Sequence, residues 1–373
     1  MIAGGGFAAL ETALGLKALA EDRVQLTLIS PTPSFAYRPA ATIEAFSATA
    51  PVRYDLREIA AGIGGTYHRA ALAAVAPSEQ SIRLESGSRL EYDVLVLAIG
   101  AEATVAIPGA LTFRDQRDLA RFRLLLDELA TGAIRRLVFA VPSRDAWSLP
   151  VYELALLSAT HAAKHSANTE IVIVTPEPTP LAVFGVQASR LLAEVLSEQE
   201  IEFVGSSIPH SVRRNGSLAL QFDAPIDADR VVAVPELHGP RIMGTPTNWS
   251  GFVPTDCLGR VEGLRNVYAA GDITTFPIKQ GGLAAQQADA IAHTIASALD
   301  APVKELHETR VLRARLVHGE GAVVLRTELD ALGRPTGATI EHRESRWAAD
   351  LKVFGRYLTP YLAIYRSRLE PAA

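Results

Sequence analysis

A glycine-rich turn near the start of the chain constrains the fold most. Residues 4–9 read Gly-Gly-Gly-Phe-Ala-Ala, which fits the G-x-G-x-x-A pattern of dinucleotide-binding turns. In that pattern Gly4 makes the tight turn, Gly6 lets the backbone approach a pyrophosphate, and Ala9 allows a helix to pack closely on a strand. Apolar residues at positions 10, 13, 14, 16 and 19 predict that helix. An ordinary flexible turn is the alternative for such a pattern on its own.

The strand expected after this helix departs from the pattern at its end. Residues 24–29 read Val-Gln-Leu-Thr-Leu-Ile and predict the strand. An Asp or Glu usually ends it and binds ribose hydroxyls, but this position is Ser30, so adenine-side affinity must come from other residues. The first strand has only residues 1–3 available, which leads us to expect a natural start further upstream.

A second segment, far along the chain, has the features of a matching half of a binding site. Residues 266–272 read Asn-Val-Tyr-Ala-Ala-Gly-Asp, an apolar strand that ends in a glycine and a carboxylate. Gly271 keeps the backbone close to a ligand, and Asp272 can accept hydrogen bonds from ligand hydroxyls. A strand-terminal turn is the alternative. Lys279 to Gly282 then precede a predicted helix over 283–299, whose dipole favours negative charge at its first turn.

Two further segments belong to the same predicted unit. Residues 92–100 predict a buried parallel strand that ends in Ala98-Ile99-Gly100. Residues 35–39 read Phe-Ala-Tyr-Arg-Pro, and these aromatic and cationic side chains suit a loop that covers a ligand. An ordinary surface loop explains them equally well.

A second α/β unit repeats this organisation without its glycines. Helices are predicted over 119–129, 150–164 and 186–196, and strands over 137–141, 171–174 and 201–204. The turn over 139–150 contains no glycine where the backbone must approach a pyrophosphate. Arg144 and the helix amides after Ser148 leave weak or altered nucleotide binding open. Trp147 is as well explained by packing as by shielding a cofactor.

Composition excludes several classes of protein. With 373 residues, 48% hydrophobic and 21% charged, the chain is long enough for two or three ordinary globular domains. The net charge of −5 argues against a nucleic-acid partner. A lone cysteine, Cys257, excludes an internal disulfide, a C-x-x-C pair and a thiolate cluster. No signal peptide and no run of about 18 apolar residues is present, so we expect a cytoplasmic protein.

The sequence predicts no metal site and no catalytic thiol. His161 and His165, four residues apart on a predicted helix, are the only ligand-like pair, and no third ligand accompanies them. Cys257 lies in a predicted turn with only Arg260 nearby to stabilise a thiolate. Both features are therefore interpreted as structural.

These motifs, in this order, resemble the pyridine nucleotide-disulfide oxidoreductase superfamily, within it the branch of sulfide:quinone oxidoreductases and type II NADH dehydrogenases. The likeness covers roughly residues 1 to 300. It implies two nested Rossmann-like domains, a three-layer α/β fold, and non-covalent FAD. Carried over by position, the cofactor-binding residues would be Gly4, Gly6, Phe7, Ala8, Ala9, Ser30, Arg38, Pro39, Ala98, Gly100, Gly271, Asp272, Lys279, Gly281 and Gly282.

The resemblance also assigns roles and shows two departures. Residues 4–9 would meet the FAD pyrophosphate, Asp272 would hold the ribityl chain, and Lys279 would lie beside the flavin ring as a candidate catalytic residue. The sulfide enzymes use cysteines that this chain lacks, since only Cys257 exists. The NADH enzymes use a middle-domain glycine turn that is also absent, so we expect NAD(P)H to bind poorly if it binds at all.

The C-terminal part is predicted as a hairpin and helices. Residues 322–329 and 338–346 are expected to pair across a turn over 332–337, and Thr359 is expected to cap a helix that starts at Pro360. Tyr361, Tyr365 and Leu369 form one stripe. We favour packing of this stripe on the first domain. The resemblance offers an alternative, contact of Phe354, Tyr357, Tyr361 and Tyr365 with a membrane surface.

The sequence therefore predicts a flavoprotein of four parts: a first FAD-binding segment over 1–110, a middle NAD(P)-binding-like domain over 111–245, a second FAD-binding segment over 246–303, and a C-terminal element over 304–373. The predicted reaction is two-electron transfer through FAD from a small-molecule donor to a quinone or another small acceptor. The alternatives are a flavin-binding protein without turnover and an NAD(P)H dehydrogenase with an altered nucleotide site. The sequence does not predict the oligomeric state.

Overall fold

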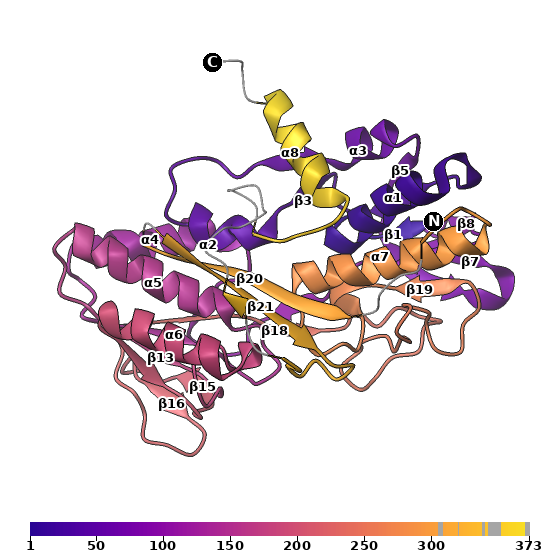
Figure 1. The fold of residues 1–373 in the computed structure, drawn as a ribbon. Helices are drawn as coiled ribbons and strands as arrows, with labels where there is room; N and C mark the ends of the chain where they lie inside the picture. The colour runs from indigo at the N-terminus through magenta and orange to yellow at the C-terminus, as the bar shows by residue number, and fades with distance from the viewer. Residues whose placement is uncertain (305–308, 320, 338–339, 342–351, 370–373) are drawn as a thin grey trace.

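Two five-stranded parallel sheets form the frame of the molecule (Figure 1). The computed structural model describes residues 1–304, 309–319, 321–337, 340–341 and 352–369. The first sheet has the order β19-β9-β1-β2-β5. Its strands are β1 Ile2–Ala3, β2 Thr27–Ser30, β5 Thr66–Arg69, β9 Leu95–Leu97 and β19 Val267–Ala269.

The second sheet lies wholly within the middle of the chain and has the order β11-β17-β12-β13-β14. Its strands are β11 Leu111–Thr112, β12 Arg136–Ala140, β13 Glu170–Val174, β14 Ile201–Val204 and β17 Arg230–Ala233. The helices of this unit are α4 Leu119–Ala130, α5 Leu149–Lys164 and α6 Val186–Glu198. Apolar runs such as Leu137 to Ala140 are fully buried, as expected for parallel strands covered on both faces.

Two helices of the first unit pack against each other although they are distant in sequence. They are α1 Phe7–Ala20 and α7 Gly281–Ala298. Gly15 permits the contact, since a Cβ there would lie 3.0 Å from the Ala292 Cβ. The smaller elements of this unit are α2 Ala41–Glu44, α3 Leu56–Gly62, β3 Ser34–Ala36, β4 Arg53–Asp55, β6 Leu72–Ala76, β7 Ser81–Leu84 and β8 Arg89–Glu91.

The chain leaves the first unit and returns to it through one pair of antiparallel strands. These are β10 Glu102–Thr104 and β18 Glu236–His238, with Ala103 opposite Leu237. A second small pair, β15 Pro209–Val212 and β16 Leu218–Leu220, lies within the middle unit. The predicted fold class, nested Rossmann-like α/β units, is confirmed, whereas the residue limits of the four predicted parts stay predictions.

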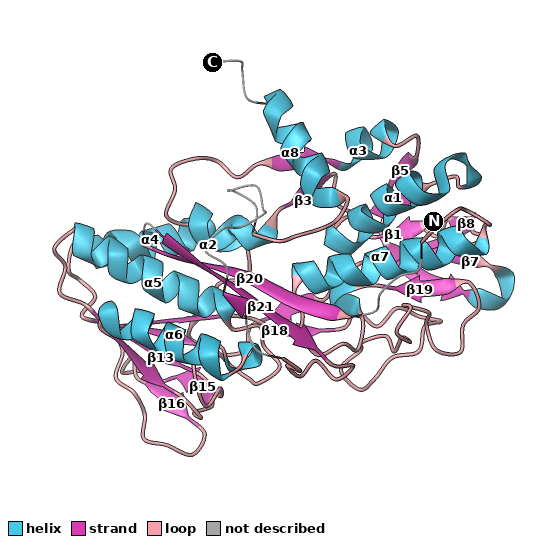
Figure 2. Ribbon diagram, viewed as in Figure 1, coloured by secondary structure: helices cyan, strands magenta, loops and turns pink. Residues whose placement is uncertain are grey.

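The C-terminal part contains a strand that the sequence analysis missed. It is β20 Arg310–His318, which pairs along its whole length with β21 Gly321–Leu329. Figure 2 shows these two long strands crossing between α5 and α7, and β20 contacts both helices. The partner predicted for 322–329 was 338–346, of which β22 Ile340–Glu341 pairs with β21 and residues 338–339 and 342–346 lie outside the described residues.

The last helix, α8 Leu358–Leu369, packs on the first unit. The prediction that Thr359 caps it was wrong, because the Thr359 hydroxyl donates to the Val353 carbonyl and accepts from the Gly355 amide, both in the preceding segment. Tyr365 is buried, its ring lies 5.2 Å from that of Tyr54, and its hydroxyl donates to Glu58 at 2.6 Å. This is the packing predicted for the stripe. The Leu369 side chain lies outside the described residues.

Candidate functional site

Three predicted segments meet at the carboxyl edge of the first sheet. In the parallel ladder Ala3 lies beside Leu97, and Leu97 lies beside Ala269. The Ala98 amide donates to the Ala3 carbonyl at 2.7 Å, and the Ala270 amide donates to the Leu97 carbonyl at 3.0 Å. The glycine turn, the Ala98 to Gly100 strand end and the Gly271-Asp272 pair therefore share the edge at which open parallel sheets bind ligands.

Close backbone contact fixes the first glycine of the turn. Gly4 has φ of +138°, and a Cβ there would lie 2.0 Å from the Ala98 carbonyl oxygen. Only glycine satisfies both conditions. Gly5, to which the pattern gives no role, is also constrained, because a Cβ would lie 2.6 Å from Leu56 and 2.8 Å from the Ser30 hydroxyl.

The positions predicted to face a ligand are open. A Cβ at Gly6 or at Gly100 would meet no atom within 4 Å. The N-terminus of α1 has no side-chain cap at Gly6, which leaves its first amides for another acceptor. Ala8 and Ala9 are buried, and a Cβ at Gly271 would approach that of Ala8 to 3.2 Å. The turn is thus open toward the site and tightly packed behind it.

Ser30 has its hydroxyl engaged within the chain. It is buried, lies 3.1 Å from the Thr32 hydroxyl and accepts from the Thr32 amide at 3.3 Å. These contacts use the group that the sequence placed at the ribose position. The expectation that adenine-side affinity comes from other residues stays a prediction.

Asp272 lies half-buried in a short 3₁₀ turn directly after β19. Among the described residues its carboxylate accepts no hydrogen bond. Burial raises its pKa, while the positive charges of Lys279 and Arg38 oppose the rise. A carboxylate set in a site without its own donors is suited to accept hydroxyl groups from a ligand. The Gly271 amide beside it donates to Gln287 of α7 at 2.6 Å, a partner that the sequence did not reveal.

Lys279 lies in the same region with an unusual environment. Its ammonium sits 3.8 Å from the centre of the Phe252 ring and donates to the Thr274 carbonyl. Burial lowers its pKa to about 8, against the opposing charges of Asp272 and Asp145. This amine can therefore gain and lose a proton near neutral pH.

The predicted covering loop is only partly available to a ligand. Phe35 and Tyr37 are buried, with their ring centres 5.3 Å from that of Phe7 in both cases, and the Tyr37 hydroxyl accepts from the Val353 amide at 2.7 Å. Arg38 is exposed, 3.5 Å from Asp115, and is followed by Pro39 in a 3₁₀ turn. The aromatic residues are core, whereas Arg38 is exposed and its positive charge acts on Asp272.

The start of α7 is partly capped by the chain itself. Gln280 accepts from the Leu283 amide at 2.9 Å and donates to the Arg313 carbonyl of β20 at 3.1 Å. Gly281 lies against Val353, since a Cβ there would approach the valine methyls to 3.3 Å. Gly282 lies close to the Gln280 side chain. One of the first-turn amides expected to face a ligand is therefore already satisfied.

Two buried carboxylates were not predicted. Glu11 of α1 accepts from the Tyr357 and Leu358 amides at 2.8 and 2.7 Å, and it faces Asp289 of α7, whose pKa is raised to about 8 by burial and then by Glu11. Glu153 of α5 is paired with Lys352 and accepts from the Thr42 hydroxyl. Their partners lie more than a hundred residues away in sequence, so only the structure reveals them.

His161 and His165 lie close together, with ring centres 4.4 Å apart and ring planes tilted by 40°. Among the described residues no group of His, Cys, Asp and Glu suited to a metal ion occurs, and the absence of a metal stays a prediction. Cys257 is exposed. Trp147 is half-buried with its ring 6.3 Å from that of Phe184. Within the described ranges no helix is long and apolar enough to cross a membrane.

The fold and site define a protein of the class with two nested dinucleotide-binding units. A family model, pyridine nucleotide-disulphide oxidoreductase, matches residues 1–139 and 153–293, and the chain belongs to this family. A sulfide-quinone reductase from Aquifex aeolicus (strain VF5) is 22% identical over 328 residues, 79% of this chain and 75% of that protein. The predicted family is confirmed.

Solved structures show the same fold. A sulfide:quinone oxidoreductase from Aquifex aeolicus matches with a TM-score of 0.79 and 18% identity, over 98% of this chain and 89% of that chain. A ferredoxin reductase from Rhodopseudomonas palustris matches with a TM-score of 0.68 and 17% identity, over 88% and 81%. The chain is an oxidoreductase of this flavin-dependent family.

Proposed function

We propose that this protein binds FAD non-covalently and transfers two electrons from a small-molecule donor to a quinone or another small acceptor. One observation carries the proposal: the glycine turn, the Ala98 to Gly100 strand end and Asp272 converge on one sheet edge. FAD supplies the two-electron chemistry when bound. The protein supplies binding, orientation and charge.

The residues at this edge fit an FAD molecule. The open directions at Gly6 and Gly100 leave room for it, and the uncapped start of α1 offers amides to its pyrophosphate. No donor from the described residues reaches the Asp272 carboxylate, which leaves it for the ribityl hydroxyls. Arg38 contributes positive charge beside Asp272. The other residues that the family resemblance assigns to cofactor binding, from Phe7 to Gly282, keep those roles in this proposal.

Lys279 is the residue we assign to proton and charge control. With a pKa of about 8, its Nζ atom holds a proton at neutral pH and places a positive charge next to Asp272. Such a charge favours electron uptake at a neighbouring site, and the proton can be released when electrons leave. We keep Lys279 as a candidate catalytic residue on this basis.

The choice of donor and acceptor rests on the relatives and on what this chain lacks. The curated relative is named a sulfide-quinone reductase, which supports a quinone acceptor. A donor that needs a pair of cysteines is not expected, because Cys257 is the sole cysteine. NAD(P)H is expected to react poorly, because residues 141–150 contain no glycine.

We place the protein in the cytoplasm, with any membrane contact peripheral. A quinone acceptor dissolved in lipid would favour contact through Phe354 and Ile364, which are exposed next to and within α8. Cosedimentation with anionic vesicles tests this point. Loss of vesicle binding in a Phe354→Ser, Ile364→Ser variant is the expected result, and equal binding by both proteins would contradict it.

The decisive experiment is anaerobic stopped-flow spectroscopy of the purified protein. We expect a yellow protein that releases FAD on acid denaturation, slow bleaching by NADH and NADPH, and reoxidation of the chemically reduced protein by a soluble quinone. Colourless protein that takes up no FAD would contradict the proposal. Bound FAD that no quinone reoxidises would favour the non-catalytic alternative, and fast bleaching by NADH would favour an NAD(P)H dehydrogenase.

A further inference from the structure

A buried polar cluster occupies the carboxyl edge of the second sheet. Glu177 follows β13 by three residues and lies over the start of α5. Its carboxylate accepts hydrogen bonds from three hydroxyl groups: Tyr152 at 2.7 Å, Ser148 at 3.1 Å and Thr175 at 3.3 Å. A carboxylate has about four acceptor positions, so the chain itself uses most of its capacity.

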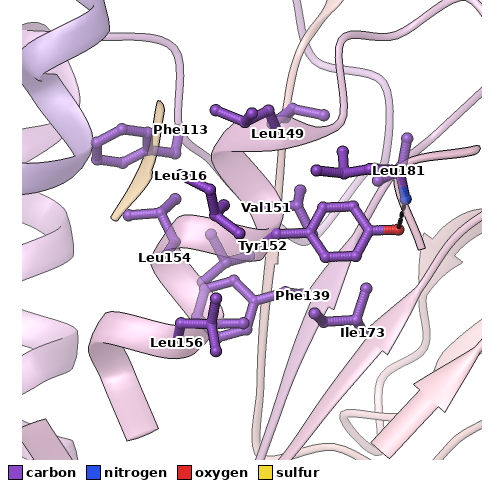
Figure 3. Close-up of a cluster of buried hydrophobic side chains, with 14 of the residues drawn as sticks. Phe113, Phe139, Leu149, Val151, Tyr152, Leu154, Leu156, Ile173, Leu181 and Leu316 are labelled. Carbon is purple, nitrogen blue, oxygen red and sulfur yellow. Dashed lines mark hydrogen bonds between the residues drawn. The ribbon is translucent and has the colours of Figure 1, made fainter. Parts of the chain in front are cut away.

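The cluster is held rigidly. Tyr152 is completely buried, and its hydroxyl accepts from the Leu181 amide at 3.3 Å, as Figure 3 shows. The Thr175 hydroxyl accepts from the Glu177 amide at 3.2 Å. The Glu177 carbonyl accepts from the Ser206 amide at 2.9 Å, beyond β14. Glu177 is therefore fixed by contacts from three neighbouring segments.

This is the place where a nucleotide would bind in a unit of this fold. The β12, β13 and β14 strands are parallel, so their carboxyl ends share this edge with the N-terminus of α5. Two positions of that helix start are unavailable to a phosphate. Pro150 has no amide hydrogen, and the Val151 amide already donates to the Ser148 carbonyl at 2.9 Å.

We propose that Glu177 is the specificity-determining residue that closes the middle unit to dinucleotides. Its carboxylate occupies the position beside the N-terminus of α5 that a phosphate of the dinucleotide would take. Ser148, Tyr152 and Thr175 use three of its about four acceptor positions, which leaves too few for a pair of ribose hydroxyls. An incoming pyrophosphate meets like charge at the point where this fold usually provides amides.

The inference deepens the proposed function, because it gives the reason why the donor is not NAD(P)H. Its test does not depend on flavin chemistry. ADP-ribose contains the adenine, both riboses and the pyrophosphate of the dinucleotide but no nicotinamide, so it cannot reduce a flavin. A failed result with ADP-ribose leaves FAD binding and quinone reduction untouched.

The test is titration calorimetry of the purified holoprotein with ADP-ribose. We expect no binding by the wild type in the millimolar range, and affinity improved by at least about tenfold in Glu177→Gln and Glu177→Ala. Thermal melting and the flavin absorbance of each variant verify that it is folded. Glu177→Gln keeps the shape of the side chain and so protects the test if Glu177→Ala unfolds.

A matched control lies at the opposite end of β13 from Glu177. Glu170, at the exposed start of β13, pairs with Arg136 at 2.7 Å, and Glu170→Gln should leave ADP-ribose binding unchanged. Acetate should raise the melting temperature of Glu177→Ala and not that of the wild type, because it refills the position between the three hydroxyls. Micromolar binding of ADP-ribose by the wild type would overturn the proposal, as would two folded Glu177 variants that bind it no better.

Discussion

The two strand-to-helix turns of this molecule have the same place in the fold and opposite properties. The turn after β1 is made of glycines and is open at Gly6. The turn after β12 contains no glycine and lies beside the Glu177 cluster. Both precede a helix that packs on a five-stranded parallel sheet. Both turn sequences are therefore compatible with the same fold. A few side chains around each turn determine which ligand can bind there.

The two turns also differ in the charges around them. At the first turn the positive charges of Lys279 and Arg38 act on Asp272 and partly balance its carboxylate. At the second, the Glu177 carboxylate is met by neutral hydroxyls. The first turn has hydrogen-bonding groups without partners among the described residues, and its charges are of both signs. At the second turn the groups of the cluster are hydrogen-bonded to one another, and Glu177 is the acid among them.

The largest expected effect comes from Gly4→Ala. The added Cβ would lie 2.0 Å from the Ala98 carbonyl, so the backbone of the first turn must move. We expect purified protein without flavin, measured by absorbance, and a lower melting temperature. Gly132→Ala is the control, because φ is +72° there but no atom lies within 4 Å, and it should cost about 1–2 kcal/mol with flavin retained. If the Gly4→Ala variant retained its flavin, the glycine turn after β1 would not be what distinguishes the first unit from the second.

The next effect tests whether the two units are held together. Lys352 is buried and pairs with Glu153 of the middle unit, while the Thr42 hydroxyl of the first unit contacts both. Lys352→Met leaves an unpaired buried carboxylate and should cost about 3–5 kcal/mol in the free energy of unfolding. Chemical denaturation measures it. Combining it with Glu153→Leu should recover part of the loss, and a double variant no more stable than Lys352→Met would show that the ion pair is not the cause.

A smaller effect is expected for Asp272→Ala. The substitution removes a buried acceptor for a ligand hydroxyl, which should weaken FAD binding by about 1–3 kcal/mol. Fluorescence titration of the apoprotein with FAD measures the affinity. Asp256→Ala, in an exposed turn of the same segment, is the control. Unchanged FAD affinity in Asp272→Ala would place the cofactor away from the first turn.

The smallest effect concerns pH at the first turn. Because burial lowers the Lys279 pKa to about 8, its positive charge is present below that pH and lost above it. Affinity for the anionic FAD should fall by about 0.2–1 kcal/mol as pH rises through 8, and Lys279→Met should show no such step. A step of equal size in Lys279→Met would assign the titration to another group.

Local pattern was enough to predict the frame of the molecule. The parallel strands are short apolar runs, and the helices between them have apolar residues at helical spacing, so α4, α5, α6 and α7 lie close to their predicted limits. The missed strand β20 also carried a signal. Its Leu312, Ala314 and Leu316 alternate with Arg313 and Arg315, and the apolar three are the buried ones.

The groups that sequence reasoning missed depend on distant partners. Glu11 is the one acidic residue of the apolar helix α1, and only the fold places backbone amides beside it. Glu177 has the same character, since its three hydroxyl donors come from both the α5 region and the β13 end. A sequence shows which residues can form such contacts, whereas tertiary packing decides which of them do.

The contacts of Glu11 also bear on when parts of the chain can fold during translation. Glu11 accepts a hydrogen bond from the Tyr357 amide, which is synthesised 346 residues later. Strand β19, which belongs to the sheet of the first unit, begins only at Val267. The first unit therefore cannot satisfy its buried carboxylate or complete its sheet until translation of nearly the whole chain. The middle unit completes its own sheet within residues 111–233, but its buried Glu153 also waits for Lys352. Nascent chains paused before residue 352 should thus be more sensitive to protease in both units than the released chain.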